Sequence, residues 1–391
     1  MARRNTWLLA ALGLIGFVII SCGGFPPVAA GEIVRPAVVE STPLTVGAAL
    51  TPTITRPRAT LPSTPEATRT SAPSPTPTPR PALRQLLQGG CCVQPFFSPD
   101  SRQVLYLDKP SSEAPTGIYG LDVTDPAATP ELMTETIGYR SPDRTVVATI
   151  EGNLTRFLEE GTGQSWTADT GGNRPHYAPD GSRIIWSATD LEGPYDRRRS
   201  DIWLAELDGN NPQLILSVVG GGFVDWMPDG QHILVLNRAD LNAEERTLVL
   251  VDLANDQRTD LATEKRLRGV EISPDGSWIA YFLTFADEPE KDGIWVVSAD
   301  GSERFKLDVP GFGGYRWRDN KTLLLIPMRS SAEESMQLWE VEVEANISRP
   351  LSDPTGLSFS ISNGDWEVSP DGRHVIFVNS LDQNIWLITL P

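Results

Sequence analysis

A short phrase that recurs seven times between residues 96 and 380 constrains the fold of this chain more than any other feature. In each copy an apolar or aromatic strand precedes a Pro-Asp turn, and a second β-rich strand follows it. The six complete copies turn at Pro99, Pro142, Pro179, Pro228, Pro274 and Pro370, and a degenerate copy turns at Arg318 and Asp319. Repeats 37 to 52 residues apart, with no helical periodicity, indicate a propeller with one four-stranded blade per repeat. We predict an all-β chain with a seven-bladed β-propeller, and six or eight blades are the alternatives.

The turn in this phrase has a structural explanation. Proline presets φ at the first turn position, and Asp and Gly accept the hydrogen-bonding and left-handed positions that follow. The phrase therefore makes a tight link between two strands. We interpret its residues as structural rather than catalytic.

Each repeat divides into an inner strand, a second strand, a third strand that often contains Trp, and a weaker outer strand. In the third repeat we expect strands at residues 175–178, 183–187, 201–207 and 213–216. The recurring third-strand indoles are expected to pack between blades; they belong to Trp203, Trp295, Trp339 and Trp386. The last repeat ends after three strands, whereas residues 83–87 match an outer strand. We predict that this N-terminal strand completes the last blade and closes the ring, which protects the blade's edge.

The first residues have the pattern of an export signal. Arg3 and Arg4 precede an uncharged run over residues 7–21, which is too short to span a bilayer comfortably. The run ends in Ile-Ile-Ser-Cys at residues 19–22, which resembles the lipobox of bacterial lipoproteins. That resemblance implies a signal peptide at residues 1–21 and lipidation of Cys22, hence anchoring on the extracytoplasmic side of a membrane. An ordinary secretory peptide and an uncleaved anchor are the alternatives.

Residues 22–82 are expected to be the anchor and a linker rather than a domain. Residues 41–82 contain 10 Pro, 11 Thr and 4 Ser, which leaves almost nothing that could form a core. We predict a disordered stalk here and the propeller over residues 83–391. A polyproline-like chain rises about 3.1 Å per residue, so this stalk could hold the domain on the order of 100 Å from a membrane.

Charge and cysteine content argue against several kinds of partner. The formal net charge of −18 argues against nucleic acid. Besides Cys22 the chain has only the adjacent Cys91 and Cys92, which could form a strained disulfide or remain thiols. Two adjacent sulfurs match no zinc pattern. We predict neither a metal site nor a cofactor.

The Ser-Pro-Asp-Gly turn at residues 273–276, the strand at 278–282 and the Ile-Trp and Asp-Gly pairs at 294–295 and 300–301 resemble the propeller repeat of the TolB C-terminal domain. Similar repeats occur in the non-catalytic domains of prolyl-oligopeptidase and dipeptidyl-peptidase enzymes. The resemblance covers residues 83–391 and implies a propeller, a fold that serves as protein-docking platform, ligand binder, gatekeeper of a hydrolase or lyase. This chain has no G-x-S-x-G nucleophile elbow, and a stalk stands where TolB has a globular domain.

The residue three places before each turn proline is polar in most repeats. The seven equivalent residues are Phe96, Tyr139, His176, Asp225, Glu271, Arg316 and Glu367. The residue after each of them is mostly apolar, and alternation along a strand sends the two sets in opposite directions. We expect the polar set to line the central channel, where its charges could hold a polar ligand or, among metals, only calcium or magnesium. The alternative that we favour is a solvated channel in which Arg316 pairs with its acidic neighbours.

Loops between second and third strands are long in four repeats, at residues 190–200, 240–246, 286–292 and 330–335. Long loops on a rigid scaffold are where binding usually occurs. The first of them carries the one basic cluster, Arg197, Arg198 and Arg199, beside Tyr195. This cluster could bind an acidic partner or a carboxylate, and a solvated loop is the alternative.

Together these features predict a monomeric, membrane-anchored lipoprotein whose propeller is a non-catalytic protein-binding scaffold for another envelope or cell-surface protein. The alternative is a cell-surface carbohydrate or small-ligand binder, or a polysaccharide lyase or hydrolase-like enzyme with its site in the channel. No set of catalytic residues supports an enzyme in the sequence itself.

Overall fold

The structure, a computed structural model, describes residues 81–88, 93–194, 197–329, 335–353 and 356–391. Cys22, the Pro/Thr-rich stalk, Cys91, Cys92 and Tyr195 lie outside these ranges, so the predictions made for them stay predictions. Within the described residues, no helix is both long and apolar enough to cross a membrane.

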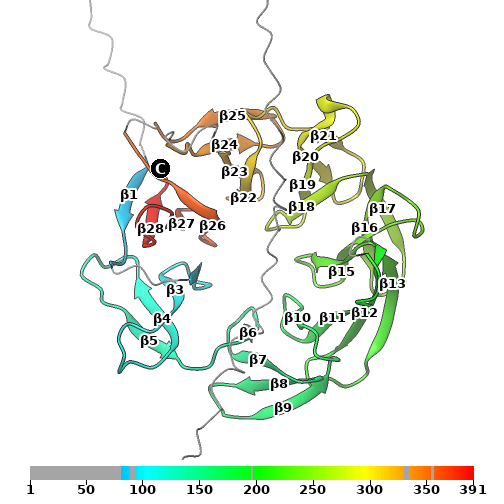
Figure 1. Cartoon of the computed structure of the whole chain (residues 1–391), viewed down its shortest axis with the longest axis horizontal. Helices are drawn as coiled ribbons and strands as arrows, with labels where there is room; N and C mark the ends of the chain where they lie inside the picture. The colour runs from blue at the N-terminus through cyan, green and yellow to red at the C-terminus, as the bar shows by residue number, and fades with distance from the viewer. Residues whose placement is uncertain (1–80, 89–92, 195–196, 330–334, 354–355) are drawn as a thin grey trace, which may run out of the picture. The chain divides into compact units, whose positions relative to one another are not determined.

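Seven antiparallel sheets of four strands follow one another around a ring, with their first strands innermost (Figure 1). Blade 1 comprises β2 (Val93–Phe97), β3 (Gln103–Asp108), β4 (Gly117–Asp122) and β5 (Glu131–Thr134). Blade 2 comprises β6 (Tyr139–Arg140), β7 (Val146–Glu151), β8 (Leu154–Glu159) and β9 (Ser165–Asp169). Blade 3 comprises β10 (His176–Tyr177), β11 (Arg183–Thr189), β12 (Arg199–Glu206) and β13 (Gln213–Val219).

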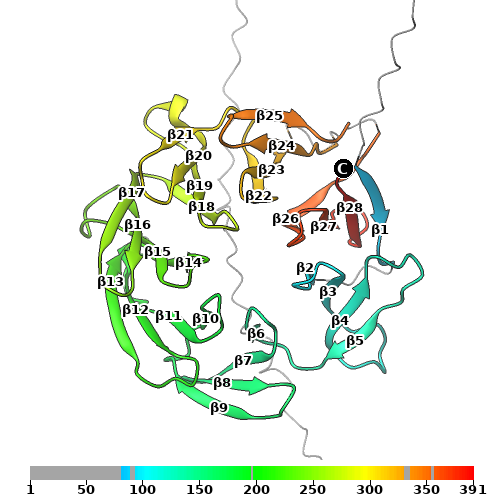
Figure 2. The same cartoon turned by 180° about the vertical axis from the view of Figure 1, so that it is seen from behind.

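The remaining blades repeat this order and are seen from behind in Figure 2. Blade 4 comprises β14 (Gly222–Trp226), β15 (His232–Asn237), β16 (Arg246–Asp252) and β17 (Arg258–Glu264). Blade 5 comprises β18 (Leu267–Ile272), β19 (Trp278–Leu283), β20 (Gly293–Ser298) and β21 (Arg304–Lys306). Blade 6 comprises β22 (Gly313–Trp317), β23 (Thr322–Pro327), β24 (Trp339–Glu342) and β25 (Ile347–Pro350). The seven-bladed propeller predicted from the repeats is confirmed.

Blade 7 joins the two ends of the domain. Its sheet has the order β1, β28, β27, β26, in which β26 is Ile361–Val368, β27 is His374–Asn379 and β28 is Ile385–Thr389. The fourth strand is β1 (Ala82–Gln85), which pairs antiparallel with β28 in a register that aligns Leu83 with Ile388. The predicted ring closure by an N-terminal outer strand is therefore confirmed.

The repeated turn is held by one pattern of hydrogen bonds, seen clearly in blade 5. The Ser273 hydroxyl donates to the Asp275 carboxylate at 2.8 Å and accepts from the Trp278 backbone N–H at 3.0 Å. The same serine–aspartate bond recurs at Ser98–Asp100, Ser141–Asp143 and Ser369–Asp371. These hydrogen bonds stabilise the turn, so the residues of the Pro-Asp phrase have a structural role.

The third turn position needs positive φ, and glycine supplies it in four repeats. Two copies instead place Ser101 and Arg144 there, at φ of 61° and 64°. Both side chains bind a neighbouring blade: the Ser101 hydroxyl accepts from the Asp371 N–H at 3.0 Å, and Arg144 Nη2 donates to the Phe97 carbonyl at 2.5 Å. These contacts to the neighbouring blades offset the unfavourable backbone conformation.

Apolar side chains between adjacent blades form the core. The six apolar clusters among the described residues lie at six of the seven junctions, all except that between blades 1 and 2. The third-strand indoles are half-buried against these clusters, as predicted; they are Trp203, Trp295, Trp339 and Trp386. Packing between blades therefore determines which residues of each strand are apolar.

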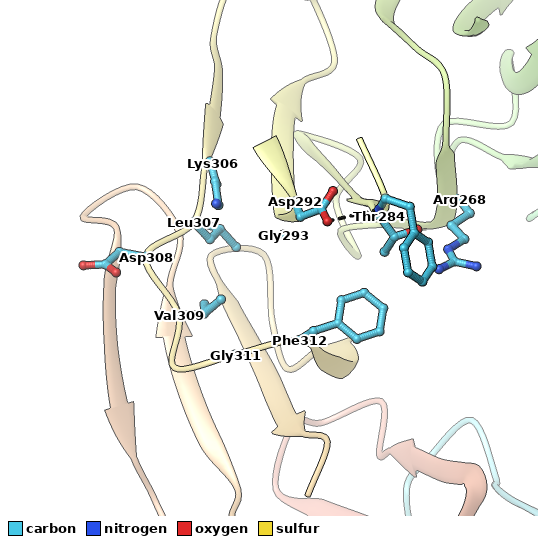
Figure 3. Close-up of a pocket in the computed structure, with 11 residues that line it drawn as sticks. Arg268, Thr284, Asp292, Gly293, Lys306, Leu307, Asp308, Val309, Gly311 and Phe312 are labelled. Atoms are coloured by element: carbon cyan, nitrogen blue, oxygen red, sulfur yellow. Dashed lines mark hydrogen bonds between the residues drawn. The ribbon is translucent and has the colours of Figure 1, made fainter. Parts of the chain in front are cut away.

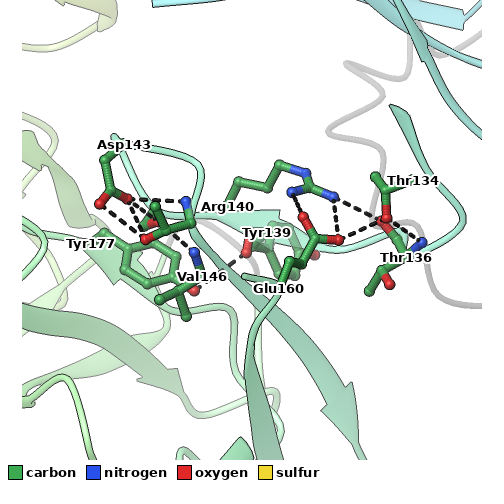
Figure 4. A network of polar contacts seen from close by, with 10 residues as sticks. Thr134, Thr136, Tyr139, Arg140, Asp143, Val146, Glu160 and Tyr177 are labelled. Carbon is green, nitrogen blue, oxygen red and sulfur yellow. Dashed lines mark hydrogen bonds and ion pairs between the residues drawn. The ribbon is translucent and has the colours of Figure 1, made fainter. Parts of the chain in front are cut away.

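The junction of blades 1 and 2 is held by a polar network (Figure 4). Glu160 accepts hydrogen bonds from Arg140 at 2.7 Å and, across the junction, from the Thr134 hydroxyl at 2.7 Å. Arg140 Nη2 also donates to the Thr136 carbonyl at 3.0 Å. Burial raises the pKa of Glu160, but the hydrogen bonds from Arg140 and Thr134 outweigh it, and the pKa lies below its usual value.

Candidate functional site

The five polar residues predicted to line the channel lie on the first strands of blades 3 to 7, which are the innermost strands of the ring (Figure 1). They are His176 on β10, Asp225 on β14, Glu271 on β18, Arg316 on β22 and Glu367 on β26. Their side chains are partly accessible to solvent, yet protein surrounds them closely enough to weaken the hydration of a charge. This partial burial shifts the pKa values of the four channel residues described next.

Glu271 and Arg316 form an ion pair between blades 5 and 6. Arg316 Nη1 lies 2.6 Å from Glu271 Oε1, and its guanidinium also stacks 5.5 Å from the centre of the Trp366 ring of blade 7. Burial, helped by the Asp225 carboxylate, outweighs the guanidinium and raises the pKa of Glu271 to about 7. The structure thus has the pairing of Arg316 with an acidic neighbour that we favoured.

Glu367 connects blade 7 to blade 1. Its Oε1 accepts from the Phe97 backbone N–H at 3.5 Å, at the long limit for a hydrogen bond. Burial raises the pKa of Glu367, while that hydrogen bond and the charge of Arg144 lower it less. Burial also raises the pKa of Asp225, whose Oδ1 accepts from the Trp226 N–H at 2.8 Å.

His176 is held as a neutral ring at neutral pH. Its imidazole lies edge-on to Phe223, with the ring centres 4.9 Å apart, and its carbonyl accepts from the Trp226 indole N–H at 3.2 Å. Burial, and then the charge of Arg174, lower the pKa of His176 to about 4. The contacts to Phe223 and Trp226 tie blade 3 to blade 4.

In three blades the residue that follows the channel position carries a polar tip that ties it to the neighbouring blade. Trp317 Nε1 donates to the Glu271 carbonyl at 3.2 Å, as Trp226 does to His176, and the Tyr177 hydroxyl lies 3.3 Å from the Tyr139 carbonyl. The predicted packing role of this set is borne out for Phe97, Trp226 and Trp317, which are all buried.

Sequence reasoning missed two arginines beside the channel residues. The Arg144 guanidinium lies 4.6 Å from the Phe96 ring centre, and the Arg174 guanidinium lies 4.7 Å from that of Tyr139. Arg144 carried a signal, since a long side chain occupied the turn position where four other repeats have glycine. Arg174 precedes its turn proline by five residues and falls outside the repeated phrase.

Across the described part of the chain, no three His, Cys, Asp or Glu side chains lie close enough together to hold a metal ion. The histidines are spread over β10, β15 and β27. His232 of β15 pairs with Asp229, with 2.6 Å between Nδ1 and Oδ2. The residues that could have held calcium or magnesium, Asp225, Glu271 and Glu367, do not converge on one point.

The three arginines of the predicted basic cluster take different environments. Arg197 is exposed at the end of its loop. Arg198 is half-buried and lines a cavity between blades 3 and 4 together with Arg246. Arg199 begins β12 and pairs with Asp201 at 3.1 Å. Arg197 and Arg199 are therefore more accessible to a partner than Arg198 is.

The loops between second and third strands share a feature that charge analysis did not reveal. Strands within a blade are antiparallel, so all these loops leave the ring at the same face. Five consecutive blades place one large apolar side chain, 53 to 81% exposed, in this connection: Leu191, Leu241, Phe285, Met328 and Leu381. We call these five residues the apolar arc.

The domain is similar in fold to several solved structures. An oligogalacturonate lyase in complex with manganese matches at a TM-score of 0.55 and 13% identity, covering 80% of this chain and 97% of the other. An oligogalacturonate lyase from Vibrio parahaemolyticus matches at a TM-score of 0.57 and 12% identity with the same coverage. A putative TolB from Agrobacterium tumefaciens matches at 0.41 and 18%, over 67% of this chain and 94% of the other.

No family model and no curated protein sequence matches the chain. At such low identities the likeness to solved structures concerns the fold alone. The seven-bladed propeller expected from the repeats is present, and the two oligogalacturonate lyases have the same kind of fold. The matches assign no activity.

Proposed function

We propose that this chain is a non-catalytic, extracytoplasmic binding protein whose propeller docks another envelope or cell-surface protein on the face that carries the apolar arc. The apolar arc is the observation that carries the proposal. Exposed apolar side chains are unremarkable when scattered singly, but their recurrence at equivalent places in five blades gathers them on one face. Large apolar anchors within a polar surface are typical of protein interfaces.

The channel supports a binding role over a catalytic one. Most of its ionisable groups serve the assembly of the ring: Glu271 pairs with Arg316 of the next blade, Glu367 binds the backbone of blade 1, and His176 packs on Phe223 of blade 4. A general acid or base must reach a substrate proton with its ionisable group, and these groups are engaged with neighbouring blades. Asp225 differs, because among the described residues its carboxylate accepts only from the Trp226 N–H of its own blade. The binding surface is therefore proposed at the loops.

A matched set of surface substitutions tests the docking face. Leu191→Ser combined with Leu241→Ser is expected to abolish capture of a partner by crosslinking in intact cells. Leu214→Ser combined with Ile347→Ser removes two apolar side chains, 47 and 57% exposed, from the outer strands β13 and β25 and is expected to leave capture unchanged. The proposed docking face is contradicted if both double variants lose the partner equally, or if neither variant loses it.

The lipid anchor belongs to the same proposal and has its own test. Cys22→Ser is expected to move the protein from the membrane fraction to the soluble extracytoplasmic fraction and to end its labelling by a fatty-acid probe. A protein that stays with the membrane after this substitution would be held by an uncleaved apolar segment instead.

A polysaccharide lyase is the second candidate, because two oligogalacturonate lyases match this domain at TM-scores above 0.5. Lyase action on oligogalacturonate would generate an unsaturated product that absorbs ultraviolet light. We expect no such product with or without added manganese. If product formed and Glu271→Gln abolished it, the chain would be a lyase and the proposal of a non-catalytic binding protein would be wrong.

A further inference from the structure

A cavity of about 400 Å³ opens between blades 5 and 6 (Figure 3). Its walls come from β18, the β19–β20 loop, the end of β21 and the chain that leads into β22. The residues used below are Arg268, Thr284, Phe285, Lys306, Val309 and Phe312. This volume lies in the range of small-molecule sites, roughly 300 to 1,000 Å³.

Aromatic and aliphatic side chains give the cavity an apolar surface. Phe312 packs on Phe282 with 4.4 Å between ring centres, and Val309 lies on the same side of the cavity as Lys306 in Figure 3. Phe285 is exposed, and its backbone is left-handed, with φ at 55°. Asp292 holds that backbone by accepting the N–H groups of Phe285 and Ala286 at 3.1 and 2.8 Å.

The conformation of Phe285 requires an explanation, because a bulky residue at positive φ is a genuine outlier. Such strain persists where surrounding contacts impose it, and it gathers at ligand clamps and similar sites. Here the carboxylate of Asp292 fixes the loop while the Phe285 ring remains largely in solvent. An apolar ring is thereby held beside the cavity before any ligand arrives.

One charged group of the cavity lacks a partner among the residues that the structure describes. The exposed guanidinium of Arg268 forms no hydrogen bond or ion pair within the described ranges. Thr284 also lines the cavity, but its hydroxyl oxygen is buried and makes no hydrogen bond with any described residue. Figure 3 places Arg268 and Thr284 on one side of the cavity, opposite Lys306.

The combination selects for one kind of ligand. A guanidinium favours a carboxylate, which it can bind through two parallel hydrogen bonds. The Lys306 ammonium, which donates to the Glu290 carbonyl at 2.7 Å, adds a second positive charge to the cavity. Two carboxylates also line it: Asp292 is occupied by the N–H groups of Phe285 and Ala286, and Asp308 points away from the cavity in Figure 3.

We propose that this cavity is a binding site for a carboxylate that carries a compact aromatic or aliphatic body. Arg268 binds the carboxylate, and Phe285 and Phe312 cover the apolar body. Such a group could be a free small acid or the C-terminal residue of a peptide. The site stands independently of protein docking on the apolar arc, although Phe285 belongs to both.

Titration calorimetry with the intact protein tests the site, with 3-phenylpropionate and N-acetyl-phenylalanine, each compared with its amide, as probes of the free acid. A hexapeptide that ends in Phe, as free acid and as C-terminal amide, distinguishes the second source. We expect the acids to bind and the amide of each pair to bind at least about 10-fold more weakly, the effect of losing a hydrogen bond to a charged group. Binding of the peptide acid as well as the free acids identifies a C-terminus as a ligand, whereas free acids alone identify a small molecule.

Variants locate the binding. Arg268→Gln is expected to weaken the acids about 10-fold, and Arg102→Gln, an exposed arginine of blade 1, is expected to leave the affinity unchanged. The proposal is overturned if no acid binds at millimolar concentration, if amides bind as well as acids, or if Arg268→Gln binds like the wild type.

Discussion

Glu271 of blade 5 binds blade 6 twice, since its carboxylate lies 2.6 Å from Arg316 Nη1 and its carbonyl accepts from the Trp317 indole at 3.2 Å. The side chain faces the channel while the carbonyl faces the junction between blades. One residue thus links the electrostatics of the channel to the packing of the ring. The pH dependence of stability is expected to report on this link.

We predict that Glu271→Gln reduces the pH dependence of the free energy of unfolding. The pKa of Glu271 is about 7 in the folded state, above its ordinary value of 4.5. A pKa raised by folding gives stability that is present below pH 4.5 and is lost as pH rises through 7. The wild type is therefore expected to gain on the order of 1–2 kcal/mol relative to the variant between pH 8 and pH 5.5.

His176 contributes to the pH dependence of stability with the opposite sign. Because the wild type and Glu271→Gln both contain His176, its contribution cancels when the two proteins are compared. The pKa of His176 is about 4 in the fold, so its contribution to stability is lost as pH falls from 6.5 toward 4. Denaturant unfolding at several pH values measures both proteins. Parallel curves for wild type and Glu271→Gln would show that Glu271 is already ionised throughout this range.

Deletion of residues 82–88 is predicted to destabilise the propeller strongly. It removes β1, leaves β28 as an unpaired edge, and takes Leu83 from the cluster between blades 6 and 7. A melting curve followed by circular dichroism measures the effect, and deletion of residues 45–75 is the control that preserves β1. An unchanged melting temperature in the first deletion would mean that the ring does not depend on this strand.

Glu160→Gln is predicted to loosen the junction of blades 1 and 2. The carboxylate accepts from Thr134 and Arg140, and weakening such charged hydrogen bonds costs about 1–2 kcal/mol. Hydrogen exchange should accelerate in β5 and β6 more than in β14 or β18. Glu151→Gln, which removes an exposed ion pair at 3.9 Å in the same blade, should change stability by less than about 0.5 kcal/mol. If both substitutions reduced stability to a similar extent, the polar network would stabilise the junction no more than an exposed ion pair does.

Ser273→Ala is predicted to cost about 1–3 kcal/mol, because it leaves the buried Trp278 N–H without its acceptor. It also removes a hydrogen bond that, together with those from Ser277, lowers the pKa of Asp275 against the effect of burial. Equilibrium unfolding by urea gives the value. Ser302→Ala alters an exposed serine bound to Asp300 and should cost less; an equal loss would point to a general effect of serine removal.

Much of the fold was accessible from the sequence because the repeats share a fixed spacing from the turn proline. That spacing located the seven first strands, and the missing strand of blade 7 followed from counting. Strand ends were less accurate: β12 begins at Arg199 rather than residue 201, and β13 continues to Val219 rather than residue 216. Hydrogen bonding to the next strand sets these ends, and apolar patterning alone does not specify it.

The functional surfaces were harder to predict. The alternation rule identified His176 and Glu271, but the partners of these residues come from other blades. The three arginines at 197–199 are adjacent in sequence, yet their environments differ because Arg198 lines a cavity and Arg199 pairs with Asp201. The cavity near Thr284 draws on separate segments of blades 5 and 6, so no local pattern could indicate it.

The pairing of β1 with β28 has a mechanical consequence. The polypeptide that precedes Ala82 continues directly into the strand that closes the ring, so tension along that polypeptide would load β1 first. β1 lies at the edge of its sheet and pairs with β28 alone, in four aligned residue pairs. A force applied from the N-terminal side would therefore act on the pairing of β1 with β28 before it reached any other part of the propeller. The force needed to separate β1 from β28 would then be the largest force that the folded domain can withstand.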